Sequence, residues 1–181
     1  MHLNPYGTEP VQLAVDLTNE PPQTVRELAE RCRDAGVHIE LPATRADLVA
    51  ITELLTSWVR VVDATDERAR AALTNELLTD WADHPRLTDH ADGWHLHYRP
   101  DRASLSRILA TLISVGTALH LTGRGMDRLG RCGASDCDRV FADTSRNGTQ
   151  RWCSTRCGNR SAVRRHRARS VTDSRPRARS R

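Results

Sequence analysis

The sequence predicts a mainly α-helical protein with a small β-hairpin, in which an N-terminal helical domain precedes a small, cysteine-rich C-terminal module. Three observations lead to this prediction. Apolar residues recur at the spacing of amphipathic helices through most of residues 24–121. One stretch near residue 94 alternates with a period of two, as strands do. Four of the five cysteines lie between residues 132 and 157.

The first 36 residues combine an ambiguous segment with a clear helix. Val11–Leu17 is apolar and compatible with a strand or a helix, and Pro21-Pro22 breaks the chain after it. Thr24 followed by Glu27 is a capping-box pattern, which predicts a helix that begins after Thr24 and ends at Gly36. The apolar positions of this helix are Val25, Leu28, Ala29 and Cys32.

Three further helices are predicted, over residues 44–62, 66–81 and 104–121. Thr44 is expected to cap the first, and glycines at 123 and 125 end the last, which is the longest. The inward faces are Leu48, Ile51, Leu54, Leu55, Trp58 and Val62; then Ala69, Leu73, Leu77 and Trp81; and then Leu105, Ile108, Leu109, Leu112, Val115 and Leu119.

A β-hairpin is predicted between the last two of these helices. Asp92-Gly93 is a type I′ turn signal, and Trp94–Tyr98 reads as a strand whose partner is Leu87–Asp89. Alternation places Trp94, Leu96 and Tyr98 on one face of that strand. We interpret Trp58, Trp81 and Trp94 as core residues where helices meet the hairpin, with an apolar pocket as the alternative.

The cysteines predict a metal site. Cys132 and Cys137 form a C-x4-C pair, and Cys153 and Cys157 form a C-x3-C pair after fifteen intervening residues. Two such pairs can place four thiolates around one Zn²⁺ ion. Because four thiolates close the coordination shell and leave no position for water, we expect one structural zinc rather than a catalytic one. Cys32 makes the cysteine count odd, which also favours ligands over disulfides.

The charge of the chain is divided unequally. Residues 1–123 carry 11 Arg against 18 Asp and Glu, a net −7, whereas residues 124–181 carry 16 Arg against 5 Asp, a net +11. All 27 basic residues are arginine, which binds phosphate and guanine bidentately. The module therefore has the charge expected of a nucleic-acid contact. The candidate contact residues are Arg146, Arg151, Arg156, Arg160, Arg164, Arg165, Arg167 and Arg169.

We expect a knuckle that carries Cys132 and Cys137, then a small hairpin near Val140-Phe141, and then a helix whose first turn carries Cys157. This order resembles a treble-clef zinc finger. Phe141 and Trp152 are the expected apolar lining of this small core. A module of this size cannot fold on apolar burial alone, so metal binding should supply most of its stability.

The stretch from Cys132 to Arg169, with Trp152-Cys153-Ser154 and Cys157-Gly158-Asn159-Arg160, resembles the CGNR zinc finger family. The preceding part is similar to the ABATE domain that accompanies this finger in bacterial stress-induced transcription regulators. One departure is that three residues rather than the usual four separate the last two cysteines. The resemblance implies a sensor or dimerisation domain at 1–123, a zinc finger with an arginine-rich helix at 124–169, and duplex DNA as the partner.

Two alternatives to DNA binding remain open. The same basic arm could bind RNA, although Phe141 and Trp152 are the only aromatic residues in the finger and offer little base stacking. The finger could also dock on an acidic protein. No phosphate-binding glycine loop, nucleophile elbow or HExxH motif occurs in the sequence, and we expect no enzyme.

Candidate ligand-binding residues in the helical domain are weaker. Asp16 and Asn19 would share a face of a helical turn, where the resemblance implies a pocket and an Asx cap before Pro21 is the alternative. His95 and His97 point to the same face of their strand, as a metal-binding pair or as a solvated hairpin face.

We further expect a cytoplasmic protein, because the sequence shows no signal peptide and no apolar run long enough to span a membrane. A homodimer is expected, because one finger covers few base pairs, and a small-molecule effector is possible. Residues 170–181 are Arg, Ser and Pro-rich and are predicted to be a disordered basic tail.

Overall fold

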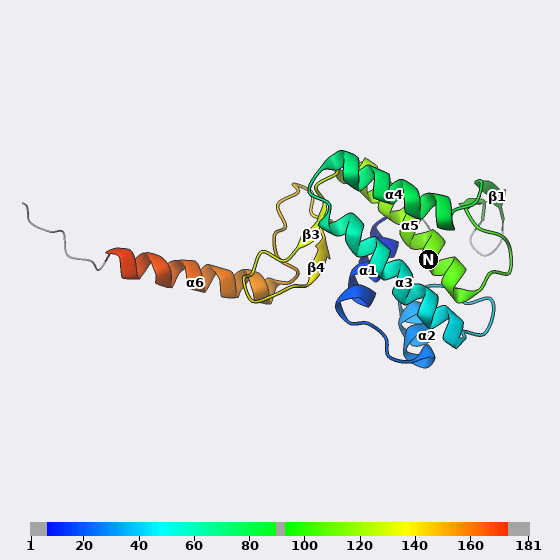
Figure 1. Ribbon diagram of the computed structural model, residues 1–181, viewed down its shortest axis with the longest axis horizontal. Helices are drawn as coiled ribbons and strands as arrows, with labels where there is room; N and C mark the ends of the chain where they lie inside the picture. Colours follow the sequence, from blue (N-terminus) through cyan, green and yellow to red (C-terminus); the bar gives the residue numbers. More distant parts are fainter. Residues whose placement is uncertain (1–6, 90–92, 174–181) are drawn as a thin grey trace, which may run out of the picture.

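The computed structural model describes residues 7–89 and 93–173, apart from the side chains of residues 168–173. Within these residues the protein is mainly helical, with two small antiparallel hairpins, which confirms the predicted fold class. Helices α1 to α5 form a body, the hairpin β3–β4 lies at one end of it, and helix α6 projects away (Figure 1). The hairpin β1–β2 lies at the opposite end of the body.

Helix α1 (Thr8–Asn19) resolves the ambiguity of the first apolar segment in favour of a helix. Helix α2 (Val25–Asp34) begins after Thr24, whose hydroxyl accepts a hydrogen bond from the Glu27 backbone N–H at 3.1 Å. The reciprocal bond goes from the Gln23 N–H to the Glu27 carboxylate at 2.8 Å, one residue earlier than a capping box requires.

Helix α3 (Arg45–Asp63) carries a complete capping box, formed by Thr44 and Asp47. Asp47 also accepts the Ser106 backbone N–H at 2.8 Å, so its buried carboxylate joins the starts of α3 and α5 (Leu105–Arg124). In α4 (Glu67–Trp81), Leu77 faces the core as predicted, but Ala69 is exposed and Arg70 is buried instead. The prediction for Ala69 was wrong because Arg70 takes the inward position to bind carbonyl groups.

Helix α5 is the central helix of the body. Its N-cap is Ser104, and it extends past Gly123 to Arg124. Where it crosses α1, a Cβ on Gly116 would lie 2.7 Å from the Pro10 Cβ, so only glycine permits this close packing. In the described part of the chain, α5 alone has the length and hydropathy of a membrane span; 67% of its apolar window is buried inside the protein, the position of a core helix.

The hairpin of β1 (Arg86–Thr88) and β2 (His95–His97) forms in the predicted place, with Leu87 opposite Leu96. Asp92, in the predicted turn, lies outside the described residues. The predicted inward face was wrong: Trp94 is 72% exposed and Leu96 is 48% exposed, whereas His97 is buried. The reversal follows from Arg99, which also points inward and forms an ion pair with Glu40 at 2.7 Å.

The hairpin of β3 (Leu129–Arg131) and β4 (Val140–Ala142) lies between body and finger. Leu129, Val140 and Ala142 are buried in the same apolar core as the helices, with β4 against α1 and β3 against α3. The hydrophobic core therefore continues across the predicted boundary at residue 123.

Candidate metal centre and basic helix

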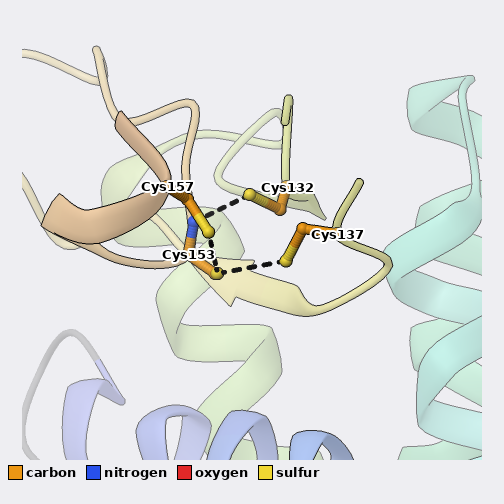
Figure 2. Close-up of side chains that lie close together, drawn as sticks. All are labelled: Cys132, Cys137, Cys153 and Cys157. Atoms are coloured by element: carbon orange, nitrogen blue, oxygen red, sulfur yellow. Dashed lines mark hydrogen bonds between the residues drawn. The ribbon is translucent and has the colours of Figure 1, made fainter. Parts of the chain in front are cut away.

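The four clustered cysteines converge on one point (Figure 2). Cys132 and Cys137 lie in the turn between β3 and β4, and Cys153 and Cys157 lie at the start of α6 (Thr155–Asp173). The Sγ atoms of all four lie within 4.8 Å of one another. The Sγ of Cys153 is 3.7 Å from that of Cys137 and 3.7 Å from that of Cys157. These separations are far longer than the roughly 2.05 Å of a disulfide bond.

The geometry and the thiol chemistry both fit zinc. Four sulfurs at about 2.3 Å from a central Zn²⁺ lie about 3.8 Å apart in a tetrahedron, close to the two separations above. Burial and the neighbouring thiols raise the pKa of Cys153 to about 12, so these groups would not all ionise without a cation among them. The four cysteines hold one structural zinc ion. The short C-x3-C spacing still brings both sulfurs to the site.

The metal centre has a small apolar lining. Trp152 packs against the cluster of Cys132, Ala134 and Cys157, as the sequence predicted. A Cβ on Gly158 would lie 3.5 Å from the Trp152 ring, so the helix start sits directly on the indole. Phe141 is also buried, against Gly130 of the neighbouring strand. The hairpin predicted between the cysteine pairs was misplaced, because the partner of β4 is β3, which precedes Cys132.

Polar contacts fix the finger to the body on two sides. The Asn19 side-chain amide donates to the Val140 carbonyl at 2.9 Å and accepts from the Val140 N–H at 2.8 Å. Arg131 forms a two-pronged ion pair with Asp63 at the end of α3, with N–O distances of 2.7 and 2.9 Å. These contacts bind each strand of the hairpin to a different helix.

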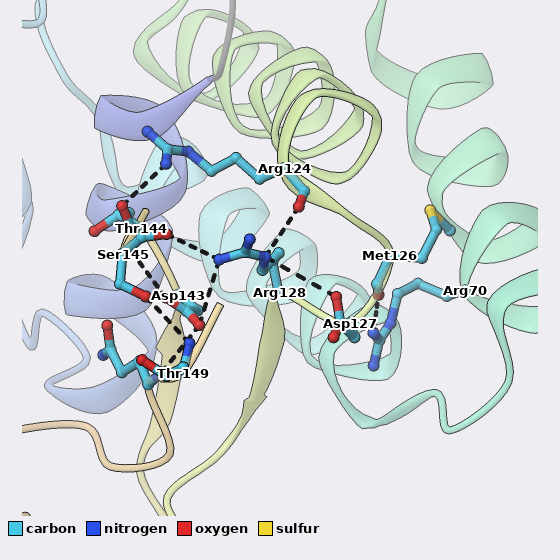
Figure 3. A network of polar contacts seen from close by, with 10 residues as sticks. Arg70, Arg124, Met126, Asp127, Arg128, Asp143, Thr144, Ser145 and Thr149 are labelled. Carbon is cyan, nitrogen blue, oxygen red and sulfur yellow. Dashed lines mark hydrogen bonds and ion pairs between the residues drawn. The ribbon is translucent and has the colours of Figure 1, made fainter. Parts of the chain in front are cut away.

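A third attachment comes from two arginines, one at the end of α5 and one after it (Figure 3). Arg124 donates to the Thr144 carbonyl at 2.9 Å, and Arg128 donates to the Ser145 carbonyl at 2.9 Å. Asp143 is buried, lies 3.5 Å from Arg128, and accepts from the Ser145 and Gln150 backbone N–H groups. Burial alone would raise the pKa of Asp143, but these hydrogen bonds and Arg128 lower it, so the carboxylate stays charged.

The candidate nucleic-acid residues fall into two groups. Arg160 and Arg164 both contact Asp136 in the knuckle, at 3.2 and 3.6 Å, and Arg164 also bonds Ser135. The other described candidates are exposed and make no ion pair within the described residues: Arg146, Arg151, Arg156, Arg165 and Arg167. Arg165 lies over the Trp152 ring, 5.5 Å from its centroid. Arg169 lies in α6, and its side chain is outside the described residues.

Helix α6 extends to Asp173, so residues 170–173 of the predicted tail are helical and that part of the tail prediction was wrong. Residues 174–181 lie outside the described residues. Asp136 was missed by the sequence reasoning. The only signal for it was an acidic residue inside the C-x4-C loop, four positions after Cys132.

The ligand candidates of the body separate in space. Asn19 is used in the contact with Val140, so neither the pocket nor the Asx cap describes its side chain. Asp16 is exposed, accepts a hydrogen bond from Gln12, and lines a cleft of about 430 Å³ with Arg31 and Arg139.

The two histidines of the β1–β2 hairpin lie together, with Nε2 atoms 3.0 Å apart, and His95 Nδ1 lies 2.7 Å from the Gly93 carbonyl. Among the described residues, the four cysteines are the one group of three or more ligand-type side chains close enough to hold a metal ion. His95 and His97 therefore have no third metal ligand beside them in the described part of the chain. The fifth cysteine, Cys32, is fully buried in the body, and burial raises the pKa of its thiol to about 12.

The CGNR zinc finger family matches residues 128–170, which include the four cysteines and both strands of the β3–β4 hairpin. No curated protein matches the chain. Residues 128–170 are thus similar to the zinc finger of this family, and a zinc finger of this kind indicates a role in binding nucleic acid or protein.

Proposed function

We propose that the protein is a transcription regulator that binds duplex DNA through its zinc finger and helix α6. The observation that carries the proposal is the set of exposed arginines without an ion pair in the described residues: Arg146, Arg151, Arg156, Arg165 and Arg167. They belong to the same finger as the metal centre, which is structural because four thiolates leave no open coordination position. A rigid, cationic surface of this kind suits a polyanion.

Helix α6 supports this proposal by its shape. It begins on the zinc centre and projects away from the body, so a double helix can approach it without steric conflict with α1 to α5 (Figure 1). An α-helix fits the major groove of B-form DNA, and arginine side chains can contact phosphates on either side of that groove. Zinc orders the start of this helix, so DNA binding should require the metal.

The helical body, residues 1–123, is proposed to act as an ABATE-like sensor or dimerisation domain in a cytoplasmic homodimer. The attachments of Asn19, Asp63 and Arg124 to the finger would transmit a change in the body to the zinc centre. A small-molecule effector would act most directly in the cleft lined by Asp16, Arg31 and Arg139, because Arg139 belongs to the finger and Asp16 to α1.

The test is selection of genomic DNA fragments by the zinc-loaded full chain at near-physiological salt, with structured RNA as competitor. Recovery of a recurrent short site that RNA does not displace is the expected result. A dimer should recover two half-sites, spaced by about one turn of DNA. Unrelated fragments displaced by RNA would favour the RNA-binding alternative. No retention of either nucleic acid would leave an acidic protein as the partner.

A further inference from the structure

The neighbouring residues Arg164 and Arg165 of α6 differ in their compensating charge. Successive residues on an α-helix point about 100° apart, so Arg164 and Arg165 face different directions. Arg164 faces the knuckle and shares the Asp136 carboxylate with Arg160. Arg165 faces Trp152, on the same side as Gly158 seven residues earlier. A DNA phosphate approaching Arg164 meets the negative charge of Asp136, whereas the described residues that line the cleft at Arg165 include no acidic one.

The Trp152 side also has the shape of a binding site. A cleft of about 430 Å³ opens there, and Arg131, Phe141, Arg151, Trp152 and Arg165 are among the residues that line it. Arg131 is engaged by Asp63, so its charge is balanced. Arg151 and Arg165 make no ion pair within the described part of the chain and leave the cleft with a net positive charge.

Trp152 prepares Arg165 for this role. The Arg165 guanidinium lies over the Trp152 ring, 5.5 Å from its centroid, which is within the range of a cation–π contact. Such a contact leaves the N–H groups of a guanidinium available to other partners. Those groups form the planar fork that binds two oxygens of a phosphate. A contact with the ring favours the conformations of Arg165 that lie over Trp152, so binding should lose less conformational entropy than it would for an unsupported arginine.

We infer that Arg151 and Arg165, with Trp152 orienting Arg165, form the phosphate-binding site through which the finger holds the DNA backbone. Arg160 and Arg164 are held against the knuckle by Asp136 and contribute less. This inference rests on the proposed DNA-binding function and specifies which arginines perform it.

The experiment compares neighbouring substitutions in the full chain with zinc bound. Arg165→Gln and Arg164→Gln remove the same charge from adjacent exposed positions. Their binding to a fluorescein-labelled, mixed-sequence DNA duplex is measured by anisotropy between about 50 and 200 mM salt. The salt slope is the steepness with which the logarithm of the binding constant falls with the logarithm of the salt concentration. Loss of one phosphate contact lowers it by about 0.9, so Arg165→Gln should show that change and the double variant Arg151→Gln/Arg165→Gln a change of about 1.8. Arg164→Gln should change the slope by less than half as much as Arg165→Gln.

A second comparison tests the orienting role of Trp152. Trp152→Phe keeps an aromatic face under Arg165 and should keep the salt slope, whereas Trp152→Leu should reduce it. In the Arg165→Gln background, Trp152→Leu should have no further effect on the slope, because the two side chains act as one unit. Zinc content is measured for every variant, so that loss of the finger is not mistaken for loss of the contact.

The outcomes separate the inference from the function on which it rests. A slope change for Arg164→Gln of half the Arg165→Gln change or more overturns the assignment of the site while DNA binding stands. Trp152→Phe behaving like Trp152→Leu overturns the orienting role. Absence of DNA binding by the unmodified, zinc-loaded chain overturns both the inference and the proposed function.

Discussion

The side chain of Asn19 pairs with the backbone of Val140 as a neighbouring strand would. Its amide donates to the Val140 carbonyl at 2.9 Å and accepts from the Val140 N–H at 2.8 Å, although 121 residues separate the two. Strand β4 has β3 on one side only, so its other edge needs partners. Asn19, at the last position of α1, supplies both a donor and an acceptor for that edge.

Replacement of Asn19 by alanine should therefore loosen the finger hairpin. The Val140 N–H and carbonyl would be left buried without these partners, at a cost of about 1–3 kcal/mol for each of the two groups. Hydrogen exchange at the Val140 amide should accelerate strongly, and the free energy of unfolding should fall by about 2 kcal/mol. Asp16→Ala is the matched control on α1, because Asp16 is exposed and its side chain has Gln12 as its one partner among the described hydrogen bonds. Equal exchange at Val140 in both variants would contradict the pairing.

The sequence predicted the helices of the body well and this contact not at all. The α3 cap at Thr44 and the α2 cap at Thr24 were readable because caps are local and involve residues three positions apart. Asn19 and Val140 meet only after the hairpin packs on α1, and no local pattern encodes that meeting. The prediction of the buried face of β2 was wrong for a related reason. Alternation places Trp94 and His97 on opposite faces of the strand but does not determine which face is buried.

Arg70 is a second long-range feature, and it predicts a specific substitution effect. Its buried guanidinium donates to the carbonyls of Val61 and Val62 at 3.0 and 3.1 Å, and also to those of Ala64 and Met126. The first three carbonyls lie at the end of α3 and just beyond it, where helices leave carbonyl groups unsatisfied. Arg70 thus closes α3 and holds the loop that leads into the finger.

Arg70→Lys should destabilise the protein by about 2–3 kcal/mol, because a single ammonium cannot reach all four carbonyls. Thermal or urea unfolding measures the change. Arg68→Lys is the control, since Arg68 is exposed on the same helix and should change stability by less than about 0.5 kcal/mol. A similar small effect at both positions would show that Arg70 does not hold the loop.

Asp47 predicts how stability responds to acid. Burial alone would raise its pKa, but hydrogen bonds from the Ser106 N–H and from Thr44 outweigh burial and lower the pKa below 3.8. The folded state therefore favours the carboxylate, and its contribution is fully present above about pH 4 and is lost as the pH falls below that value. Asp47→Asn should reduce the free energy of unfolding by about 1–2 kcal/mol near neutral pH.

The difference between the unmodified protein and Asp47→Asn should shrink as the pH falls below about 4, because Asp47 is protonated first in the unfolded chain and, at lower pH, in the folded protein as well. Urea unfolding of both proteins in zinc-free buffer measures this, since acid also releases zinc from thiolates. A difference that stays constant down to pH 3 would mean that the charge of Asp47 does not stabilise the joint between α3 and α5.

The metal centre was the most predictable part of the site. Cysteine spacing alone gave the four ligands, because each ligand pair closes a short loop that the fold scarcely alters. Which arginines of α6 keep a positive charge that no nearby carboxylate balances was not predictable. It depends on Asp136, which the knuckle brings back against Arg160 and Arg164, and on Trp152 beneath Arg165.

Zinc removal should unfold only part of the finger. The sequence suggested that metal supplies most of the stability of this module, but Leu129, Val140 and Ala142 are buried in the body core and do not depend on the metal. The knuckle and the start of α6 have little apolar burial of their own, in the small cluster around Trp152, beside the exposed ion pairs of Asp136 with Arg160 and Arg164. Chelation should therefore release residues 132–137 and 153–167 while the β3–β4 hairpin stays in place.

Hydrogen exchange with and without chelator, under reducing conditions, measures this division. Protection should be lost at the Cys157 amide and kept at the Val140 amide, and far-ultraviolet circular dichroism should lose helix from α6 alone. Cys137→Ser should reproduce the chelated state, with zinc content well below one per chain. Cys32→Ala should keep its zinc, since Cys32 lies in the body core. Full zinc retention by Cys137→Ser would exclude the four-cysteine site, and loss of protection at Val140 on chelation would show that the metal also holds the hairpin.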